Sequence, residues 1–67
     1  MILNFASRIL KLRLEKGVTQ EDLANFVGIT KASVSKWENA ISMPDISLLP
    51  RIATYFGVSI DDLLGYL

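Results

Sequence analysis

Three glycines, each followed two residues later by a threonine or a serine, divide this chain into short segments. The pairs are Gly17 with Thr19, Gly28 with Thr30, and Gly57 with Ser59. Glycine readily adopts the left-handed conformation that often ends a helix. A hydroxyl side chain shortly afterwards is a favoured N-cap for the next helix. The spacing therefore predicts that one helix ends and another begins at each of these places.

Together with the spacing of apolar residues, these signals predict helices over residues 5–16, 20–27, 31–39, 46–56 and 60–65. Apolar residues recur every three or four positions within each range, which gives each helix one apolar face for a shared core. They never alternate cleanly, so strands are not expected. We predict an all-α fold, and 67 residues suit a single domain over residues 1–67.

Two local details of these helices make specific predictions. Thr19 and Ser59 are each followed three residues later by an aspartate, which is the pattern of a reciprocal capping box. Pro50 lies inside the fourth predicted helix, where it removes a backbone donor and crowds the preceding turn. Either the first turn of that helix is distorted, or the regular helix begins nearer Leu48.

The residue types missing from the chain exclude most catalytic chemistry. The chain has no histidine, the commonest general base, and no cysteine. The serines therefore lack a histidine partner, and the dispersed glycines form no phosphate-binding loop. Asp61 and Asp62 are adjacent, but neighbouring residues on a helix do not face each other. We expect no enzyme activity, no metal site and no cofactor.

The charge balance says little about the partner. Seven lysines and arginines balance seven aspartates and glutamates, whereas a nucleic-acid binder usually carries a positive excess. Binding depends on how charge is distributed over the surface, which a total does not show. No apolar run is long enough to span a bilayer, and the start lacks the regions of a signal peptide. We therefore expect a cytoplasmic protein with no membrane partner.

The second and third predicted helices are joined by the tight sequence VGIT. Two short helices with a glycine in the turn are typical of a helix-turn-helix, whose second helix can enter the major groove of DNA. Val34 and Trp37 would face the core. The opposite face is polar and positive, and it contains Lys31, Ala32, Ser35, Lys36 and Asn39. Taken alone, such a face is more often an ordinary solvated surface.

A more specific pattern surrounds this pair of helices. The sequence VTQEDLANFVGITKASVSKWEN, residues 18–39, resembles the Cro/repressor-type (Xre) helix-turn-helix family and is similar to the N-terminal domains of lambdoid phage repressors. The matching residues are Thr19, Gln20, Leu23, Ala24, Val27, Gly28, Ile29, Thr30, Val34, Trp37 and Glu38. The similarity extends upstream to Ile9, Leu12 and Arg13, and downstream to Pro44 and to IATYFGVSIDDLL, residues 52–64. It implies a five-helix repressor-like DNA-binding domain, usually dimeric, that reads DNA with its third helix.

The resemblance also implies roles for individual residues. The base-reading residues would be Lys31, Ala32, Ser35 and Lys36, and the residues that contact or orient phosphates would be Gln20, Thr30 and Asn39. Gln20 is further expected to support Lys31. Arg13 and Glu38 match a family pair that forms a partly buried structural ion pair, and Trp37 belongs to the core.

The chain departs from the family pattern after the third helix. Where the family often has a glycine and then basic residues, this chain reads Asn39, Ala40, Ile41, Ser42, Met43. Asparagine tolerates left-handed geometry better than most residues, so we expect the left-handed turn at Asn39. The missing basic residues remove expected phosphate contacts, so we expect one copy to bind DNA weakly.

Apolar residues also occupy positions that the family usually fills with polar ones. They are Leu10, Leu14 and Phe26, with Leu3 on the same stripe as the two leucines. Several such residues suggest a surface for a protein partner or a further domain. The first candidate for a homodimer surface is the C-terminal group of Leu64, Tyr66 and Leu67.

The combined prediction is a protein that binds double-stranded DNA in a sequence-specific manner as a transcriptional regulator. The preferred form is a repressor that acts as a homodimer on a two-fold operator. Two alternatives stay open. One is an antitoxin or restriction-control protein of the same fold, and the other is a protein-interaction module that has lost DNA binding.

Overall fold

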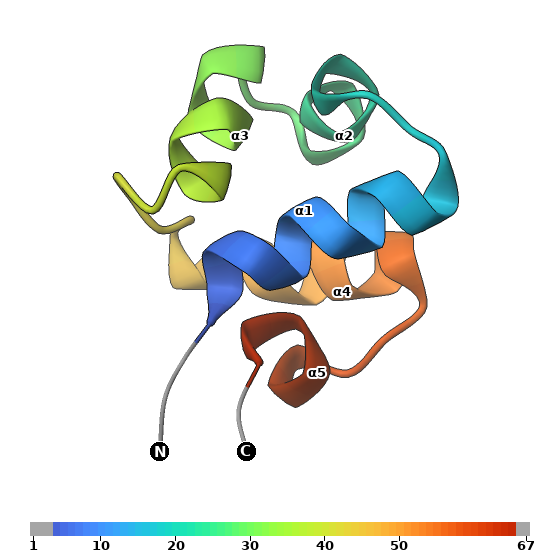
Figure 1. Cartoon of the computed structure of the whole chain (residues 1–67). Coiled ribbons are helices and arrows are strands. Elements are labelled where there is room, and N and C mark those ends of the chain that lie inside the picture. Colours follow the sequence, from blue (N-terminus) through green and yellow to red (C-terminus); the bar gives the residue numbers. More distant parts are fainter. Residues whose placement is uncertain (1–3, 66–67) are drawn as a thin grey trace.

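A computed structural model describes residues 4–65 of the chain, and these residues form helices joined by short connections, with no strand (Figure 1). The elements are α1 (Phe5–Lys16), α2 (Gln20–Val27), α3 (Lys31–Glu38), the 3₁₀ helix η1 (Ile46–Leu48), α4 (Leu49–Phe56) and α5 (Ile60–Leu64). The predicted all-α fold with five α-helices is therefore confirmed for this part of the chain. None of these helices is long and apolar enough to cross a membrane.

Helices end and begin where the glycine and hydroxyl spacing indicates. The glycines at positions 17, 28 and 57 have left-handed backbones at the ends of α1, α2 and α4. Thr19 caps α2 with a reciprocal box, in which its hydroxyl accepts from the backbone N–H of Asp22 at 3.0 Å and the Asp22 carboxylate accepts from the N–H of Thr19 at 2.9 Å. The box predicted at Ser59 is only half formed: its hydroxyl accepts from the N–H of Asp62, but the reciprocal bond is absent.

The predicted helix over 46–56 is divided into two pieces. Residues Ile46–Leu48 form a 3₁₀ turn, and the α-helix begins at Leu49 with Pro50 in its first turn. A first-turn residue has no intrahelical acceptor for its N–H, so the proline loses little there. Both alternatives therefore hold, because the first turn is distorted and the regular helix starts beside Leu48. The predicted last residues of α3 and α5, Asn39 and Gly65, are C-caps outside the regular helices.

The left-handed turn after α3 lies at Ala40 and not at Asn39. Ala40 has φ of 59°, whereas Asn39 has φ of −96°. The backbone N–H of Asn39 donates to the carbonyl of Ser35 at 3.0 Å, and its side-chain amide donates to the same carbonyl at 2.8 Å. These bonds hold Asn39 against the last turn of α3, so the chain reverses one residue later.

The core is built around α1, which packs against α3, α4 and α5. The buried apolar residues are Phe5, Ile9, Leu12, Leu23, Ala24, Val27, Val34, Trp37, Leu49, Ile52, Ala53 and Leu63. Phe5 and Trp37 meet edge to face, with ring centroids 6.1 Å apart. Both ends of the described chain lie together (Figure 1), since the N–H of Asn4 donates to the carbonyl of Leu64 at 2.9 Å. The core thus fixes α3 by its inner face and leaves its outer face free.

Candidate nucleic-acid interface

Helices α2 and α3 pack against each other as a helix-turn-helix on one side of α1 (Figure 1). Thr30 begins α3, and its hydroxyl accepts from the backbone N–H of Ser33 at 3.2 Å. Val34 is fully buried and Trp37 is 3% exposed. Burial of these two side chains removes rotational freedom from α3, so the residues on its opposite face have a defined orientation.

The outward face of α3 is polar and carries two cations. Lys31, Ala32 and Lys36 are exposed, whereas Ser35 is half-buried. The Ser35 hydroxyl accepts from the side-chain amide of Asn39 at 3.3 Å. The residues predicted to read bases therefore share one face of the helix, with Ser35 the least accessible of them.

Glu38 is turned away from this face and forms an ion pair with Arg13 of α1. Arg13 donates from Nε to Glu38 Oε2 at 2.7 Å and from Nη2 to Oε1 at 3.1 Å. The side chains are 13% and 5% exposed for Arg13 and Glu38, respectively. Arg13 also donates from Nη1 to the carbonyl of Val18 at 3.0 Å. One guanidinium thus joins α1, the α1–α2 connection and the end of α3.

Gln20 completes this network in a way that the sequence did not indicate. Its side-chain amide donates to Glu38 Oε1 at 2.9 Å, and no hydrogen bond joins it to Lys31 among the described residues. The support of Lys31 by Gln20 therefore stays a prediction, since the amide donates to the Glu38 carboxylate and the Gln20 carbonyl oxygen is the atom that could accept from Lys31. The contact orients Gln20 at the first turn of α2, beside the polar face of α3.

The network shifts the pKa values of both charged partners. Burial disfavours the charged form of Glu38, but hydrogen bonds from Arg13 and Gln20, with the attraction of the Arg13 charge, outweigh it and lower the pKa of Glu38. The hydrogen bond to Glu38 raises the pKa of Arg13 against the opposing effect of its own burial. Both groups are therefore charged at neutral pH.

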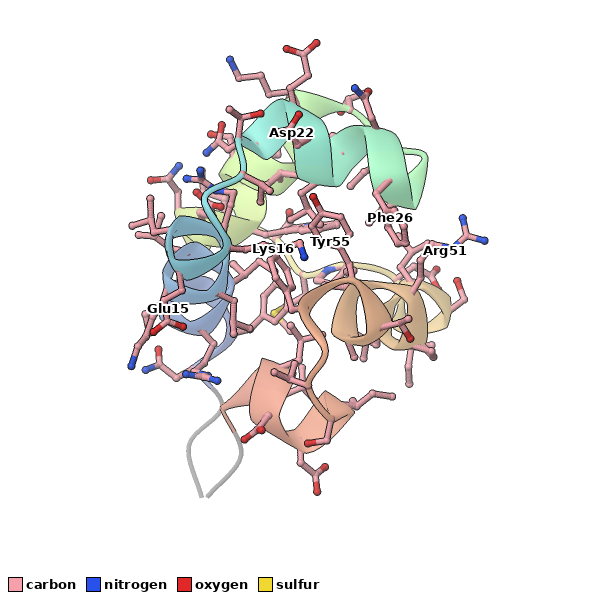
Figure 2. The ribbon with its side chains drawn as sticks, turned by 90° about the vertical axis from the view of Figure 1, so that its right-hand side faces the viewer. Glu15, Lys16, Asp22, Phe26, Arg51 and Tyr55 are labelled. Carbon is pink, nitrogen blue, oxygen red and sulfur yellow. The ribbon has the colours of Figure 1, made fainter. Side chains whose placement is uncertain are left out.

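The apolar residues predicted as a partner surface have different environments. Leu10 is half-buried, and Leu14 is 62% exposed. Phe26 is 47% exposed and stacks against Tyr55 of α4 with ring centroids 4.6 Å apart, beside Lys16 (Figure 2). Phe26 therefore has a packing role within the chain. Leu3 lies outside the described residues.

The predicted C-terminal dimer surface is only partly described. Leu64 is half-buried and packs against the core, while Tyr66 and Leu67 lie outside the described residues. A separate set of exposed apolar side chains begins in the loop 40–43, whose apolar character motivates the alternative of a protein-interaction module. Ile41, Met43 and Ile46 follow α3 and are 71%, 54% and 80% exposed. Ile46 is the one of the three that sequence reasoning missed, since it is the first residue of η1 and lies beyond that loop.

The chain matches the helix-turn-helix family HTH_3 over residues 9–63, which confirms the resemblance to Xre-type domains. It is 36% identical over 63 residues to the HTH-type transcriptional activator BcrR of Enterococcus faecalis, covering 94% of this chain and 31% of BcrR. It is 32% identical over 61 residues to the cryptic phage CTXphi transcriptional repressor RstR of Vibrio cholerae, covering 91% of this chain and 55% of RstR. The chain thus spans about 31% of the length of BcrR and 55% of the length of RstR.

Solved structures show the same arrangement of helices. The P22 c2 repressor in complex with a synthetic operator superposes with a TM-score of 0.85 at 26% identity, covering 96% of each chain. The restriction-modification controller C.AhdI of Aeromonas hydrophila gives 0.80 at 27% identity, covering 88% of this chain and 89% of the controller. Hydroxypropylphosphonic acid epoxidase of S. wedmorenis gives 0.81 at 31% identity, but over only 32% of that enzyme. The names of the curated relatives are those of transcriptional regulators and not of enzymes.

Proposed function

The chain belongs to the HTH_3 helix-turn-helix family, and from that premise we propose that it binds double-stranded DNA in a sequence-specific manner to regulate transcription. The observation that carries this proposal is the outer face of α3. Its cations are exposed while its inner face is buried, so the helix presents a polar, rigidly held surface. Such a helix fits the major groove.

Within the groove, Lys31 and Lys36 are suited to the O6 and N7 acceptors of guanine, and Ala32 to the methyl group of thymine. Gln20 and Asn39 lie at the two ends of the interface and would donate to phosphates. The chain carries no net charge, and residues 40–43 after α3 include no basic side chain to neutralise phosphates, so one copy would bind weakly. Two copies on a two-fold operator would combine two such half-sites.

Repression by occupancy is the form of regulation that we propose, because a bound dimer would block access to its operator. The named relatives include both an activator and a repressor, so recruitment of polymerase is the competing outcome. A transcription assay with the selected operator upstream of a reporter distinguishes them: added protein should lower transcript, and a rise would reverse the assignment.

Control of a restriction-modification system is a second candidate function. The observation that favours it is the match to C.AhdI over 89% of that controller's length. This form also binds DNA, so the two candidates differ in the genes they regulate. Locating the selected operator sequence in the native genome would distinguish the two candidate functions. A site upstream of restriction-modification genes would favour this candidate.

The experiment that tests DNA reading is selection of duplexes from a random pool at a stated salt concentration. The unmodified chain should enrich one sequence with two-fold symmetry. Lys31→Ala with Lys36→Ala should abolish the preference, because each lysine–guanine contact is worth about 1–3 kcal/mol of discrimination. Circular dichroism should show an unchanged fold, since both side chains are exposed.

Lys11→Ala with Lys16→Ala is the matched control, because it removes the same charge from α1. This pair should weaken binding only slightly and leave the selected sequence unchanged. If the Lys31/Lys36 variant selected the same duplex with the same affinity, the assignment of α3 as the base-reading helix would be wrong.

A further inference from the structure

The segment after α3 carries an exposed apolar surface that DNA reading does not use. Ile41, Met43 and Ile46 are 71%, 54% and 80% exposed. Between positions 40 and 48 the sequence has one charged residue, Asp45. Its carboxylate accepts from the N–H of Ser47 at 2.9 Å and so caps η1. Large exposed apolar side chains gathered in one short segment mark interaction sites more often than scattered ones do.

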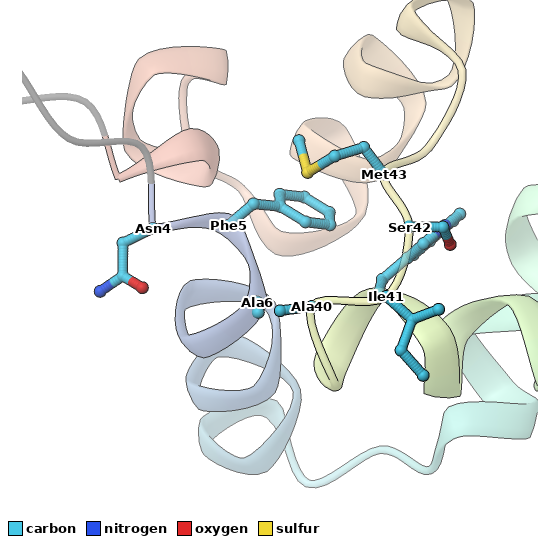
Figure 3. Close-up of a pocket in the computed structure, with 8 residues that line it drawn as sticks. Asn4, Phe5, Ala6, Ala40, Ile41, Ser42 and Met43 are labelled. Atoms are coloured by element: carbon cyan, nitrogen blue, oxygen red, sulfur yellow. The ribbon is translucent and has the colours of Figure 1, made fainter.

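Ile41 and Met43 belong to the lining of a pocket of about 360 Å³ (Figure 3). Phe5 and Trp37 line it together with Ala40 and Met43, and no residue of its lining is charged. Figure 3 shows Met43 extended toward Phe5, whereas Ile41 points in a different direction. The surface therefore combines an apolar hollow with a protruding apolar side chain. We call Ile41, Met43, Ile46 and this pocket the apolar loop surface.

The two flanks of α3 differ in charge. Helix α2 covers one flank, and the apolar loop surface follows the C-terminal end of α3 on the other side (Figure 1). The first turn of α2 carries Glu21 and Asp22. Two copies that met through α2 would place these acids opposite their own equivalents, and like charges across an interface are unfavourable. The segment that carries the apolar loop surface has one acid, Asp45, and its carboxylate already caps η1.

The size of the molecule brings neighbouring copies within contact. Successive half-sites on a two-fold operator lie about 34 Å apart, one helical turn of DNA. The principal extents of the Cα trace are 30 × 24 × 22 Å, and side chains add to these dimensions. Two copies bound in successive major grooves would therefore have facing surfaces.

Building on the proposed DNA-binding function, we propose that the apolar loop surface binds the same surface of a second copy on adjacent half-sites. A two-fold interface places the same patch on both subunits and must be self-complementary. A protruding isoleucine next to an apolar pocket meets this requirement, because each copy inserts a side chain into the other.

The area of the apolar loop surface determines whether two copies pair in solution or only on DNA. Three side chains of this exposure present on the order of 400 Å², whereas a standard stable interface needs about 800 Å² per partner. The contact is therefore too small to hold a dimer in dilute solution. It forms on DNA, where binding of both copies to one duplex raises their effective concentration. The observable consequence is cooperative filling of the two half-sites.

The test measures binding of the chain to the selected two-half-site duplex and to a duplex with one half-site. Ile41→Ser with Ile46→Ser should remove cooperativity and weaken binding to the two-site duplex about tenfold, within the usual range of coupling between sites. Its affinity for the single half-site should stay unchanged. Leu14→Ser with Ile60→Ser is the matched control, because it also replaces two exposed apolar residues. It should leave cooperativity intact.

A second measurement uses the absence of cysteine from the chain. Ile41→Cys should form an intermolecular disulfide under mild oxidation on the two-site duplex, and little on the single half-site or without DNA. Retained cooperativity in the Ile41/Ile46 variant, or its loss in the control alone, would overturn the inference while the proposed function stands. If the unmodified chain selected no duplex at all, the proposed function would fail, and this inference with it.

Discussion

The ion pair between Arg13 and Glu38 offers the sharpest test of how α3 is held. Glu38 accepts three hydrogen bonds, two from Arg13 and one from Gln20. Replacing Glu38 by alanine removes all three and leaves the Arg13 guanidinium with the carbonyl of Val18 as its remaining partner. The change therefore separates the end of α3 from α1 and from the start of α2 without touching the apolar core.

The expected loss of stability in Glu38→Ala follows from the burial of the ion pair. Removing one partner of a buried pair costs about 3–5 kcal/mol. Because Arg13 is 13% exposed and its long side chain can reach water, we take the lower limit, about 3 kcal/mol. A chain of this length has roughly 3–10 kcal/mol of total stability at the usual value per residue. Glu38→Ala should thus remove about a third or more of the total stability.

Urea unfolding followed by circular dichroism measures this loss. The midpoint should fall while the slope m stays unchanged, since the surface exposed on unfolding is nearly the same. The full cycle adds Arg13→Ala and the double variant. Because the double variant has no stranded charge, it should be more stable than the sum of the single losses predicts, by about 1–3 kcal/mol.

Glu15→Ala is the matched control, because it removes an exposed carboxylate from α1. Its effect should stay within about 0.5 kcal/mol. A loss from Glu38→Ala as small as that of the control, or a coupling of zero in the cycle, would refute the argument that this pair fastens α3.

Three further predictions follow from local geometry. The pKa of folded Glu38 lies below its unfolded value, so as pH falls below about 4.3 the unfolded chain takes up the proton first and the free energy of unfolding drops. Urea unfolding at a series of pH values should show a smaller drop for Glu38→Gln than for the unmodified chain over that window. Equal drops would contradict this. Ala40 has φ of 59°, so Ala40→Gly should stabilise the chain by about 0.5–1 kcal/mol, and a lower thermal midpoint would count against the strain. Asp22→Ala should cost about 1 kcal/mol and more than Asp62→Ala, because only the Asp22 carboxylate accepts a reciprocal bond from the N-cap backbone N–H; an equal loss in urea unfolding would show that the reciprocal bond contributes nothing.

Helix boundaries were accessible from the sequence because short-range chemistry decides them. Glycines 17, 28 and 57 and the hydroxyls after them act through bonds within a few residues. An irregularity near Pro50 in the fourth predicted helix was also foreseeable, although the sequence did not show which form it would take. A proline limits which turn can form, and the 3₁₀ geometry of Ile46–Leu48 depends in addition on the cap that Asp45 provides.

The position of the turn after α3 shows the limit of residue preference. Asparagine tolerates a left-handed backbone better than alanine does, yet Ala40 adopts it. Hydrogen bonds from Asn39 to Ser35 decide the outcome. Intrinsic preferences differ by about 1–2 kcal/mol, and a pair of local hydrogen bonds is enough to reverse them.

By itself, the sequence determined where helices begin and end, which faces are apolar, and that residues 18–39 carry a helix-turn-helix pattern. These properties depend on neighbours within one or two turns. Only the tertiary structure decided that the Glu38 carboxylate accepts a hydrogen bond from Gln20 as well as from Arg13. The contact of Phe5 with Trp37, beside the exposed Ile41, is likewise a result of tertiary packing. Such contacts join residues distant in sequence, so the packing of whole helices sets them, and no local pattern encodes that packing directly.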